Sequence, residues 1–194
     1  MQLLLATGNP GKKLELSELL VNSGFEILSL DDLSPELPQE TAETGSTFAE
    51  NALLKATAAA EHANMRTIAD DSGLEVLALN NFPGINSARW SPGSDADRCA
   101  ALLEKLGAQE DRRAQFVCVI CIYDPQTKES TTFTGTLQGT ISTKPAGTNG
   151  FGYDPIFVPE GESKTLAQLP TAYKQQSSHR AKAIRKLITF LSKL

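Results

Sequence analysis

In the N-terminal part of the chain, continuous apolar runs typical of buried strands flank a segment with the apolar spacing of a helix. Residues 3–6 form an uninterrupted apolar run, which predicts a short buried strand. Leucines in residues 13–23 recur with the spacing of one helix face, which predicts an amphipathic helix that Gly24 ends. Residues 25–30 are again largely apolar and predict a second strand. This strand–loop–helix–strand order is typical of the start of an α/β layer fold.

An alanine-rich helix is predicted next. Thr47 followed three residues later by Glu50 fits a capping box, and the helix extends to about residue 64. The remaining predicted elements are a strand at 67–71, a helix or strand at 74–79, a helix at 95–106 ended by Gly107, a hairpin of 114–123 and 130–137 that 138–142 extend, and a closing helix at 178–194. Loops are predicted at 31–45, 80–93 and 144–159.

The order of elements predicts a single domain over residues 1–194. A chain of 194 residues is long enough for one full core, and neither a repeat nor a low-complexity linker divides it. The expected fold is an α/β unit that allows a division into two lobes with a cleft between them.

Charge narrows the classes of function. The chain carries 23 acidic and 18 basic residues, for a net charge of −5, so it lacks the basic excess of a non-specific nucleic-acid-binding protein. A negatively charged protein gains nothing from long-range attraction to a polyphosphate. Binding such a ligand would require local lysine and arginine side chains or a divalent cation.

The three cysteines predict structural roles. Cys118 and Cys121 form a CxxC pair within the apolar run 116–122, where positions three apart on a strand point to opposite faces. No second pair completes a zinc site, so we expect these residues and Cys99 to be reduced core residues of a cytoplasmic protein. The first apolar run is too short for a signal peptide, and no stretch approaches the about 20 residues that span a membrane.

Residues 7–13 join the first strand to the first helix and predict an anion site. Backbone N–H groups at a helix start attract anions, and Gly8 and Gly11 let a phosphate approach the backbone closely. Lys12 and Lys13 in the first turn cost about 0.3–1 kcal/mol each, which a bound polyphosphate would offset. The spacing differs from that of a P-loop, and a plain turn with solvated lysines remains the alternative.

Asp70 and Asp71 end the predicted strand at 67–71 and precede Ser72 and Gly73. Two carboxylates at a strand end suit Mg²⁺, which prefers oxygen ligands and keeps several waters. Taken alone, however, the motif is more typical of an aspartate-rich turn. If the strand persists through Asp71, the two side chains point to opposite faces and do not both bind one metal ion.

An aromatic residue between glycines marks a candidate base-binding loop. Phe151 would be costly to expose unless something stacks on it, and a purine base is a suitable partner. Asp154 would accept hydrogen bonds from the edge of a base. The alternative is a loop packed onto the core, which fits Tyr153 especially well.

Isolated charged residues complete the candidates. Glu43 precedes the alanine-rich helix and is either a metal ligand or a surface charge. Lys174, His179 and Arg180 lie at or near the start of the last helix, where they would contact a base or a phosphate. The alternative there is a serine cap, at Ser178, followed by exposed basic residues.

Together these segments resemble the Ham1/inosine triphosphate pyrophosphatase family, also called dITP/XTP pyrophosphatases. The resemblance extends over essentially the whole chain. Each block is weak alone, but six in this order are highly specific. The blocks are ATGNPGK at 6–12, ETGSTFAENA at 43–52 with Lys55, ADDSGL at 69–74, PGINSAR at 83–89, GFGYDP at 150–155 and SHR at 178–180.

The resemblance implies two lobes around a long mixed β-sheet flanked by helices, usually as a homodimer. It implies Mg²⁺-dependent hydrolysis of ITP, dITP and XTP to the monophosphate and pyrophosphate, which clears deaminated purines from the nucleotide pool. It implies that Glu43 and Asp71 bind Mg²⁺ and that Asp71 is also the catalytic base. The implied substrate contacts are Thr7, Gly8, Asn9, Pro10, Gly11, Lys12, Lys55, Ser72, Phe151, Gly152, Tyr153, Asp154, Lys174, His179 and Arg180.

Three other functions are compatible with parts of the sequence. A Maf-like nucleotide pyrophosphatase would share the fold, but the blocks around Phe151 and Arg180 argue against it. A non-catalytic nucleotide-binding regulator is a further alternative, and the intact Asp70, Asp71 and Lys12 argue against it. A magnesium phosphomonoesterase is suggested only by the sequence of residues 71–73.

Overall fold

The computed structural model describes residues 2–21, 23–33 and 41–193. Within them a mixed sheet has the strand order β2-β1-β3-β5-β6-β7, and β4 pairs with β3. The fold divides into two compact units. The first consists of the described parts of Met1–Asp71, Cys118–Gly135 and Arg180–Leu194, and the second of Ser72–Val117 and Thr136–His179. The expectation that residues 1–194 act as a single domain stays a prediction.

The sheet of the first unit begins with parallel strands. Strand β1 (Gln2–Ala6) lies between β2 (Glu26–Ser29) and β3 (Thr67–Val76) and is parallel to both. Ala6 pairs with Ala69, so the loop that leaves β1 starts beside Asp70. Strands β5 (Arg113–Asp124) and β6 (Glu129–Ile141) follow as a hairpin.

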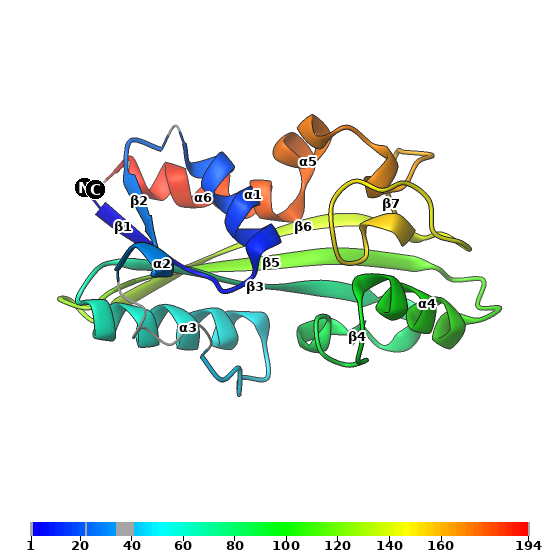
Figure 1. Ribbon diagram of the computed structural model, residues 1–194, viewed down its shortest axis with the longest axis horizontal. Coiled ribbons are helices and arrows are strands. Elements are labelled where there is room, and N and C mark those ends of the chain that lie inside the picture. The colour runs from blue at the N-terminus through cyan, green and yellow to red at the C-terminus, as the bar shows by residue number, and fades with distance from the viewer. Residues whose placement is uncertain (1, 22, 34–40, 194) are drawn as a thin grey trace. The chain divides into compact units, whose positions relative to one another are not determined.

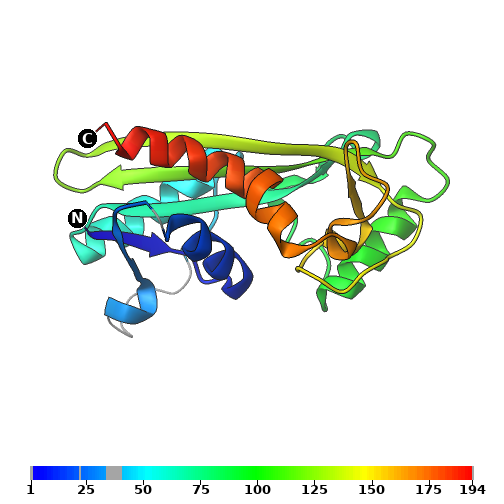
Figure 2. The same cartoon turned by 90° about the horizontal axis from the view of Figure 1, so that it is seen from above.

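Helices cover both faces of the sheet in the first unit (Figure 1). On one face, α1 (Pro10–Leu20) and α6 (His179–Leu191) bury Leu16, Leu20 and Ile184 against β1, β3 and β5. Helix α6 runs along the β5–β6 hairpin, where Lys186 donates to the carbonyl of Thr134 (Figure 2). On the other face lies α3 (Phe48–Ala63), whose alanines allow close contact.

The second unit has its own hydrophobic core. Its elements are β4 (Phe82–Pro83), α4 (Asp95–Leu106), β7 (Phe157–Pro159), α5 (Thr171–Ser177) and the distal parts of β3, β5 and β6. β4 is antiparallel to β3, and β7 is antiparallel to β6. Leu102, Leu106, Phe116 and Phe157 are buried together in this core.

Most predicted elements are confirmed, and the fold class is the predicted α/β class with a mixed sheet. The strand predicted at 67–71 was too short, because it continues to Val76, and the loop predicted at 144–159 contains a 3-10 helix at Asp154–Ile156 and β7. The loop predicted at 31–45 begins inside the short helix α2 (Leu30–Leu33), and its residues 34–40 lie outside the described part.

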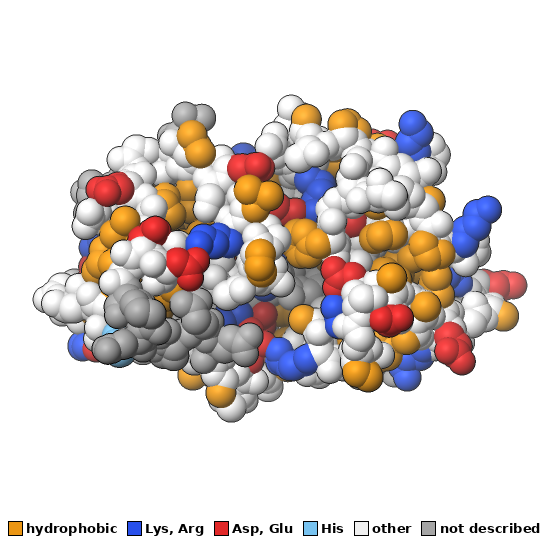
Figure 3. Space-filling model, viewed as in Figure 1, with side chains coloured by type: hydrophobic (Ala, Val, Ile, Leu, Met, Phe, Trp, Pro, Cys, Tyr) orange, Lys and Arg blue, Asp and Glu red, His pale blue; other side chains and the backbone are white. Residues whose placement is uncertain are grey.

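All three cysteines are buried free thiols, as predicted. Burial raises the pKa of the Cys118 thiol to about 12, which keeps it protonated and unreactive at neutral pH. No helix in the described part of the chain has the length and apolarity that crossing a membrane requires. On the face drawn in Figure 3, acidic and basic side chains are interspersed, in keeping with the modest net charge.

Candidate functional site

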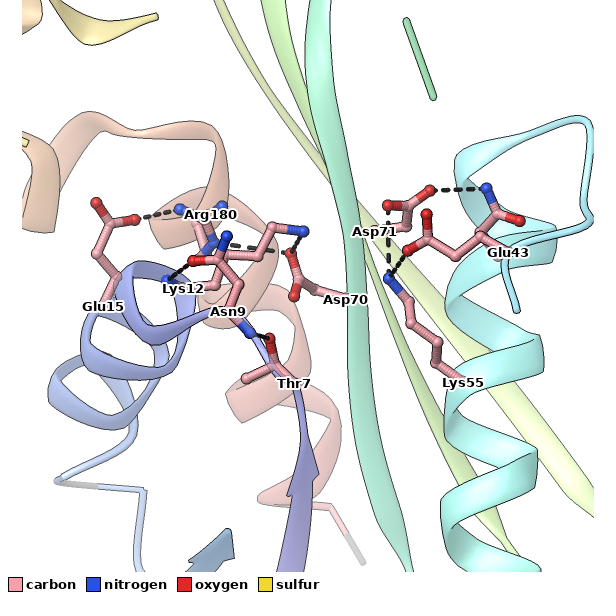
Figure 4. Close-up of polar contacts among 10 residues, drawn as sticks. Thr7, Asn9, Lys12, Glu15, Glu43, Lys55, Asp70, Asp71 and Arg180 are labelled. Carbon is pink, nitrogen blue, oxygen red and sulfur yellow. Dashed lines mark hydrogen bonds and ion pairs between the residues drawn. The ribbon is translucent and has the colours of Figure 1, made fainter. Parts of the chain in front are cut away.

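Asp70 and Asp71 lie on opposite faces of β3, as strand alternation predicts (Figure 4). Both carboxylates are nearly inaccessible, with side-chain exposures of 0% for Asp70 and 4% for Asp71. The strand continues through both residues, so the aspartate-rich turn considered for this motif is wrong. Two separate clusters of charged groups result, both within the first unit.

Asp70 is surrounded by cations. Its Oδ2 lies 3.2 Å from Lys12 Nζ and 3.8 Å from Arg180 Nε. Arg180 also forms an ion pair with Glu15 through Nη1 and is 2% exposed. Burial alone would raise the pKa of Asp70, but the charges of Lys12, Arg180 and Lys55 outweigh it and lower the pKa below its ordinary value.

Asp71 faces α3 and carries fewer counter-charges. Its Oδ2 accepts a hydrogen bond of 3.0 Å from Asn51 Nδ2, and its Oδ1 lies 3.5 Å from Lys55 Nζ. Lys55 Nζ also donates to Glu43 Oε1 at 2.6 Å. Burial raises the pKa of Asp71, because Lys55 and Lys12 offset the desolvation only in part. Burial disfavours the charged form of Lys55, yet Asp70, Asp71 and Glu43 together raise its pKa.

The start of α3 positions this second cluster. Thr47 caps the helix, and its hydroxyl accepts from the Glu50 N–H at 3.1 Å, as predicted. The capping box is completed differently from the prediction, because the Glu50 carboxylate accepts from Ser46 N and Oγ. Gly45 donates its N–H to Asn51 Oδ1 at 2.9 Å, and a Cβ at Gly45 would come within 2.7 Å of that oxygen. Glycine is therefore required for the close approach that orients Asn51.

The loop before α1 is only partly as predicted. Gly8, Asn9 and Pro10 are exposed and accessible to a ligand, but Asn9 caps the helix by accepting from the Lys12 N–H at 3.0 Å. Pro10 has no N–H, so fewer backbone donors remain for an anion than expected. The lysines of the first turn do not require a ligand for compensation, because Lys12 pairs with Asp70 and Lys13 pairs with Asp31 at 2.6 Å.

A separate group of predicted residues lies in the second unit. Lys174 Nζ is 2.7 Å from Asp154 Oδ2 and 4.8 Å from the centroid of the Phe151 ring. Asp154 Oδ2 also accepts from the Phe151 N–H at 3.0 Å, which closes the turn. A Cβ at Gly150 would lie 2.0 Å from this carboxylate oxygen, so glycine is required here as well. The turn thus holds an aromatic ring and a cation together.

Other predicted contacts of the second unit serve its core. Tyr153 is buried, and its hydroxyl donates to the Ser87 carbonyl at 2.7 Å and accepts from Trp90 Nε1 at 2.6 Å. The N–H of Gly152 donates to Asp95 Oδ2 at 2.7 Å. His179 is buried and stacks on Phe116, with ring centroids 4.8 Å apart. Ser72, which begins this unit, is half-buried.

Three residues that hold predicted site residues in place were not predicted from the sequence. Asn51 orients Asp71, Glu15 pairs with Arg180, and Asp95 anchors the loop at Gly152. Asn51 gave a usable signal, because it is a polar residue on the face of α3 whose other buried residues are Phe48 and alanines. Glu15 gave none, because its partner lies 165 residues away in the chain.

The first unit contains oxygen donors that fit a hard divalent cation. Lys55 Nζ contacts both Glu43 and Asp71, so the two predicted metal ligands lie around one ammonium group. The described residues contain no cluster of three or more His, Cys, Asp or Glu side chains that could hold a metal. Mg²⁺ needs no such cluster, because it is commonly bound by one or two carboxylates together with waters and substrate phosphates. The donor set therefore fits Mg²⁺ better than zinc.

Both the sequence and the fold match known proteins. The Ham1 family model matches residues 3–190. The dITP/XTP pyrophosphatase of Exiguobacterium sp. is 49% identical over 189 residues, which are 96% of this chain and 95% of that protein. The dITP/XTP pyrophosphatase of Staphylococcus aureus strain MW2 is 46% identical over 192 residues, which are 98% of this chain and 96% of that protein.

Solved structures agree with these matches. The Ham1 protein of Staphylococcus aureus has a TM-score of 0.88 at 45% sequence identity, over 100% of this chain and 99% of that chain. A HAM1 protein from Coxiella burnetii has a TM-score of 0.91 at 37% identity, over 100% of both chains.

Replacing Asp70 tests the buried ion cluster. Asp70→Asn removes the carboxylate that Lys12 and Arg180 share. We expect the free energy of unfolding to fall by about 3 kcal/mol, which is the order of loss when one partner of a buried ion pair is removed. Urea denaturation followed by circular dichroism measures this loss. The matched control is Asp31→Asn, which removes the exposed partner of Lys13 and should change stability by at most about 0.5 kcal/mol.

A double variant identifies the cause of the loss. Lys12→Met combined with Asp70→Asn removes one charge of each sign, so the double variant should lose less stability than the sum of the two single variants. Strictly additive losses would show that the attraction between Lys12 and Asp70 does not stabilise the fold.

Proposed function

The chain belongs to the Ham1 family, and on that basis we propose that it hydrolyses non-standard purine nucleoside triphosphates, namely ITP, dITP and XTP. The reaction consumes one water and yields the nucleoside monophosphate and pyrophosphate, which clears deaminated purines from the nucleotide pool. The observation that carries the proposal is the pair of charge clusters on the two faces of β3, which supplies lysines for a polyphosphate and carboxylates for a cation.

The first unit is proposed to bind the triphosphate. The side chains of Lys12 and Lys55 are each 15% exposed, and their ammonium groups are proposed to contact phosphate oxygens. The exposed residues at 8–10 form the loop over which a phosphate would lie. Lys12 is held by Asp70 and Lys55 by Glu43, so both cations are ordered before a ligand arrives.

Glu43 and Asp71 are proposed to bind Mg²⁺. The bound ion would neutralise charge on the phosphate oxygens. Asp71 is also the proposed base, which takes a proton from the water that attacks the α-phosphorus while the bond to the pyrophosphate oxygen breaks. Asn51 fixes one oxygen of Asp71, which limits the rotation of the carboxylate and orients its lone pairs.

The second unit is proposed to contact the base. The Phe151 ring offers a stacking surface, while Lys174, whose Nζ lies over the ring, and its partner Asp154 offer a donor and an acceptor. Tyr153 and His179 are buried and would act mainly by supporting this unit. Arg180, in the first unit, stays a predicted substrate contact, but its side chain is 2% exposed and pairs with Glu15 and Asp70, so it too would act mainly by support.

The other functions lose support. The phosphomonoesterase rested only on the sequence of residues 71–73, whereas the relatives named above are pyrophosphatases. A regulator without activity would not need a carboxylate oriented as Asp71 is. The relatives named above are dITP/XTP pyrophosphatases, a name that does not favour a Maf-like specificity.

The identity of the products tests the proposed function. Incubation with ITP, XTP, dITP, ATP and GTP and with Mg²⁺ should give pyrophosphate as the first product, with ITP, XTP and dITP turned over fastest. Pyrophosphate and orthophosphate are measured separately, and a parallel reaction with excess EDTA should show no turnover. Orthophosphate as the primary product would exclude a pyrophosphatase.

Asp71→Asn tests the base. The amide keeps the shape of the carboxylate and can still bond to Asn51, so the fold should persist while kcat falls by about 100-fold or more, the contribution typical of general base catalysis. Steady-state kinetics on ITP and thermal unfolding measure the two effects. Asp111→Asn, a change at an exposed aspartate paired with Arg113, is the control and should keep normal kcat. Near-normal turnover by Asp71→Asn would remove Asp71 as the base.

We further propose that the protein is a homodimer and that it is cytoplasmic. The dimer rests on the family resemblance, and Leu14 and Val21 of the α1 region, 61% and 73% exposed, are candidate contacts. Sedimentation analysis should give twice the chain mass of 20.8 kDa, and a monomer at all micromolar concentrations would contradict it. The cytoplasmic location is supported by the free cysteines.

A further inference from the structure

Lys55 occupies the position between two carboxylates of the first unit. Its Nζ is 2.6 Å from Glu43 Oε1 and 3.5 Å from Asp71 Oδ1 (Figure 4). The exposures of the three side chains are 15%, 20% and 4%, so solvent screens these interactions poorly. The ammonium group is therefore the counter-ion of both carboxylates.

Those carboxylates are also the proposed ligands of Mg²⁺. A divalent cation that enters beside Lys55 meets two carboxylates whose charge is already half neutralised, and it is repelled by the ammonium at short range. Either the metal binds weakly or Lys55 must move. The side chain can move, because its four-carbon stem is flexible and it keeps 15% exposure.

We propose that Lys55 is an internal counter-ion that makes metal binding depend on nucleotide binding. The inference rests on the proposed function. In the nucleotide-free protein, Lys55 neutralises Glu43 and Asp71 and keeps the metal affinity low. A triphosphate provides anionic oxygens that attract the ammonium group, and the two carboxylates then become available to the cation. By linkage, the metal strengthens nucleotide binding by the same factor.

Three other paired lysines in the described part of the chain do not combine these features. Lys12 pairs with Asp70, which faces away from the proposed metal ligands, and Lys13 pairs with the exposed Asp31. Lys128 pairs with Glu61 on the surface, with side-chain exposures of 61% and 42%. Lys128→Met therefore removes the same charge from the protein and leaves the carboxylates of Glu43 and Asp71 with their partner, which makes it a matched control.

The experiment measures Mn²⁺ binding to the nucleotide-free protein. Mn²⁺ takes the same octahedral oxygen coordination as Mg²⁺, and its free form is counted by electron paramagnetic resonance, so the measurement does not depend on turnover. Lys55→Met should bind Mn²⁺ more tightly than the wild type, by about 5- to 150-fold, the range typical of coupling between sites. Lys55→Arg, which keeps the charge, and Lys128→Met should bind as weakly as the wild type.

A second substitution locates the bound ion. Glu43→Gln in the Lys55→Met background should abolish the gain, because it removes one of the two carboxylates. Thermal unfolding verifies that each variant is folded, and Lys55→Gln replaces Lys55→Met if the latter does not fold. Unchanged or weaker Mn²⁺ binding by the folded variant would overturn the proposal. An equal gain in Lys128→Met, or a gain that survives Glu43→Gln, would overturn it too.

The product assay separates this inference from the proposed function. Formation of pyrophosphate by the wild type together with unchanged Mn²⁺ affinity in Lys55→Met would overturn only the counter-ion role. Absence of nucleotide turnover by the wild type would overturn the proposed function itself and, with it, the inference.

Discussion

The first unit depends on keeping the Asp70 carboxylate charged inside the protein. An isolated buried carboxylate would take up a proton, because desolvation strongly disfavours its charged form. Asp70 stays charged because Lys12 comes from the start of α1 and Arg180 from the start of α6. Glu15 then balances the second cation. One buried charge therefore links the starts of α1 and α6 to β3.

Strand alternation could be predicted from the sequence, and so could its main consequence. Two adjacent aspartates on a strand must face opposite sides, which separates Asp71 from the Asp70 cluster and directs it towards α3. The cap at Thr47 and the helix ended by Gly107 were also predictable, because these signals are local. The length of β3 was not, because strand pairing, rather than local preference, carries it past Gly73.

The partners of the charged residues could not be predicted from the sequence. Lys12 and Lys13 looked uncompensated because their carboxylates are distant in the chain, at Asp70 and Asp31. Cations are unfavourable at a helix N-terminus, but the two carboxylates offset this cost, so these lysines do not need a bound ligand to do so. Glu15 could not be predicted for the same reason, since its role exists only once the fold brings Arg180 beside it.

The three lysines expected to contact substrate share one property, which limits how they can act. Lys12, Lys55 and Lys174 each lie against a carboxylate, at 3.2, 2.6 and 2.7 Å. A phosphate group that binds any of them must compete with a protein carboxylate for an ammonium group that has three N–H donors. Where the existing pair separates, part of the attraction to the phosphate is offset by the lost pair. In return, the cations are ordered beforehand, and an anion too weakly charged to compete with a carboxylate would be disfavoured. In a protein of net charge −5, the predicted selectivity for a highly charged ligand would follow from this competition rather than from an excess of positive charge.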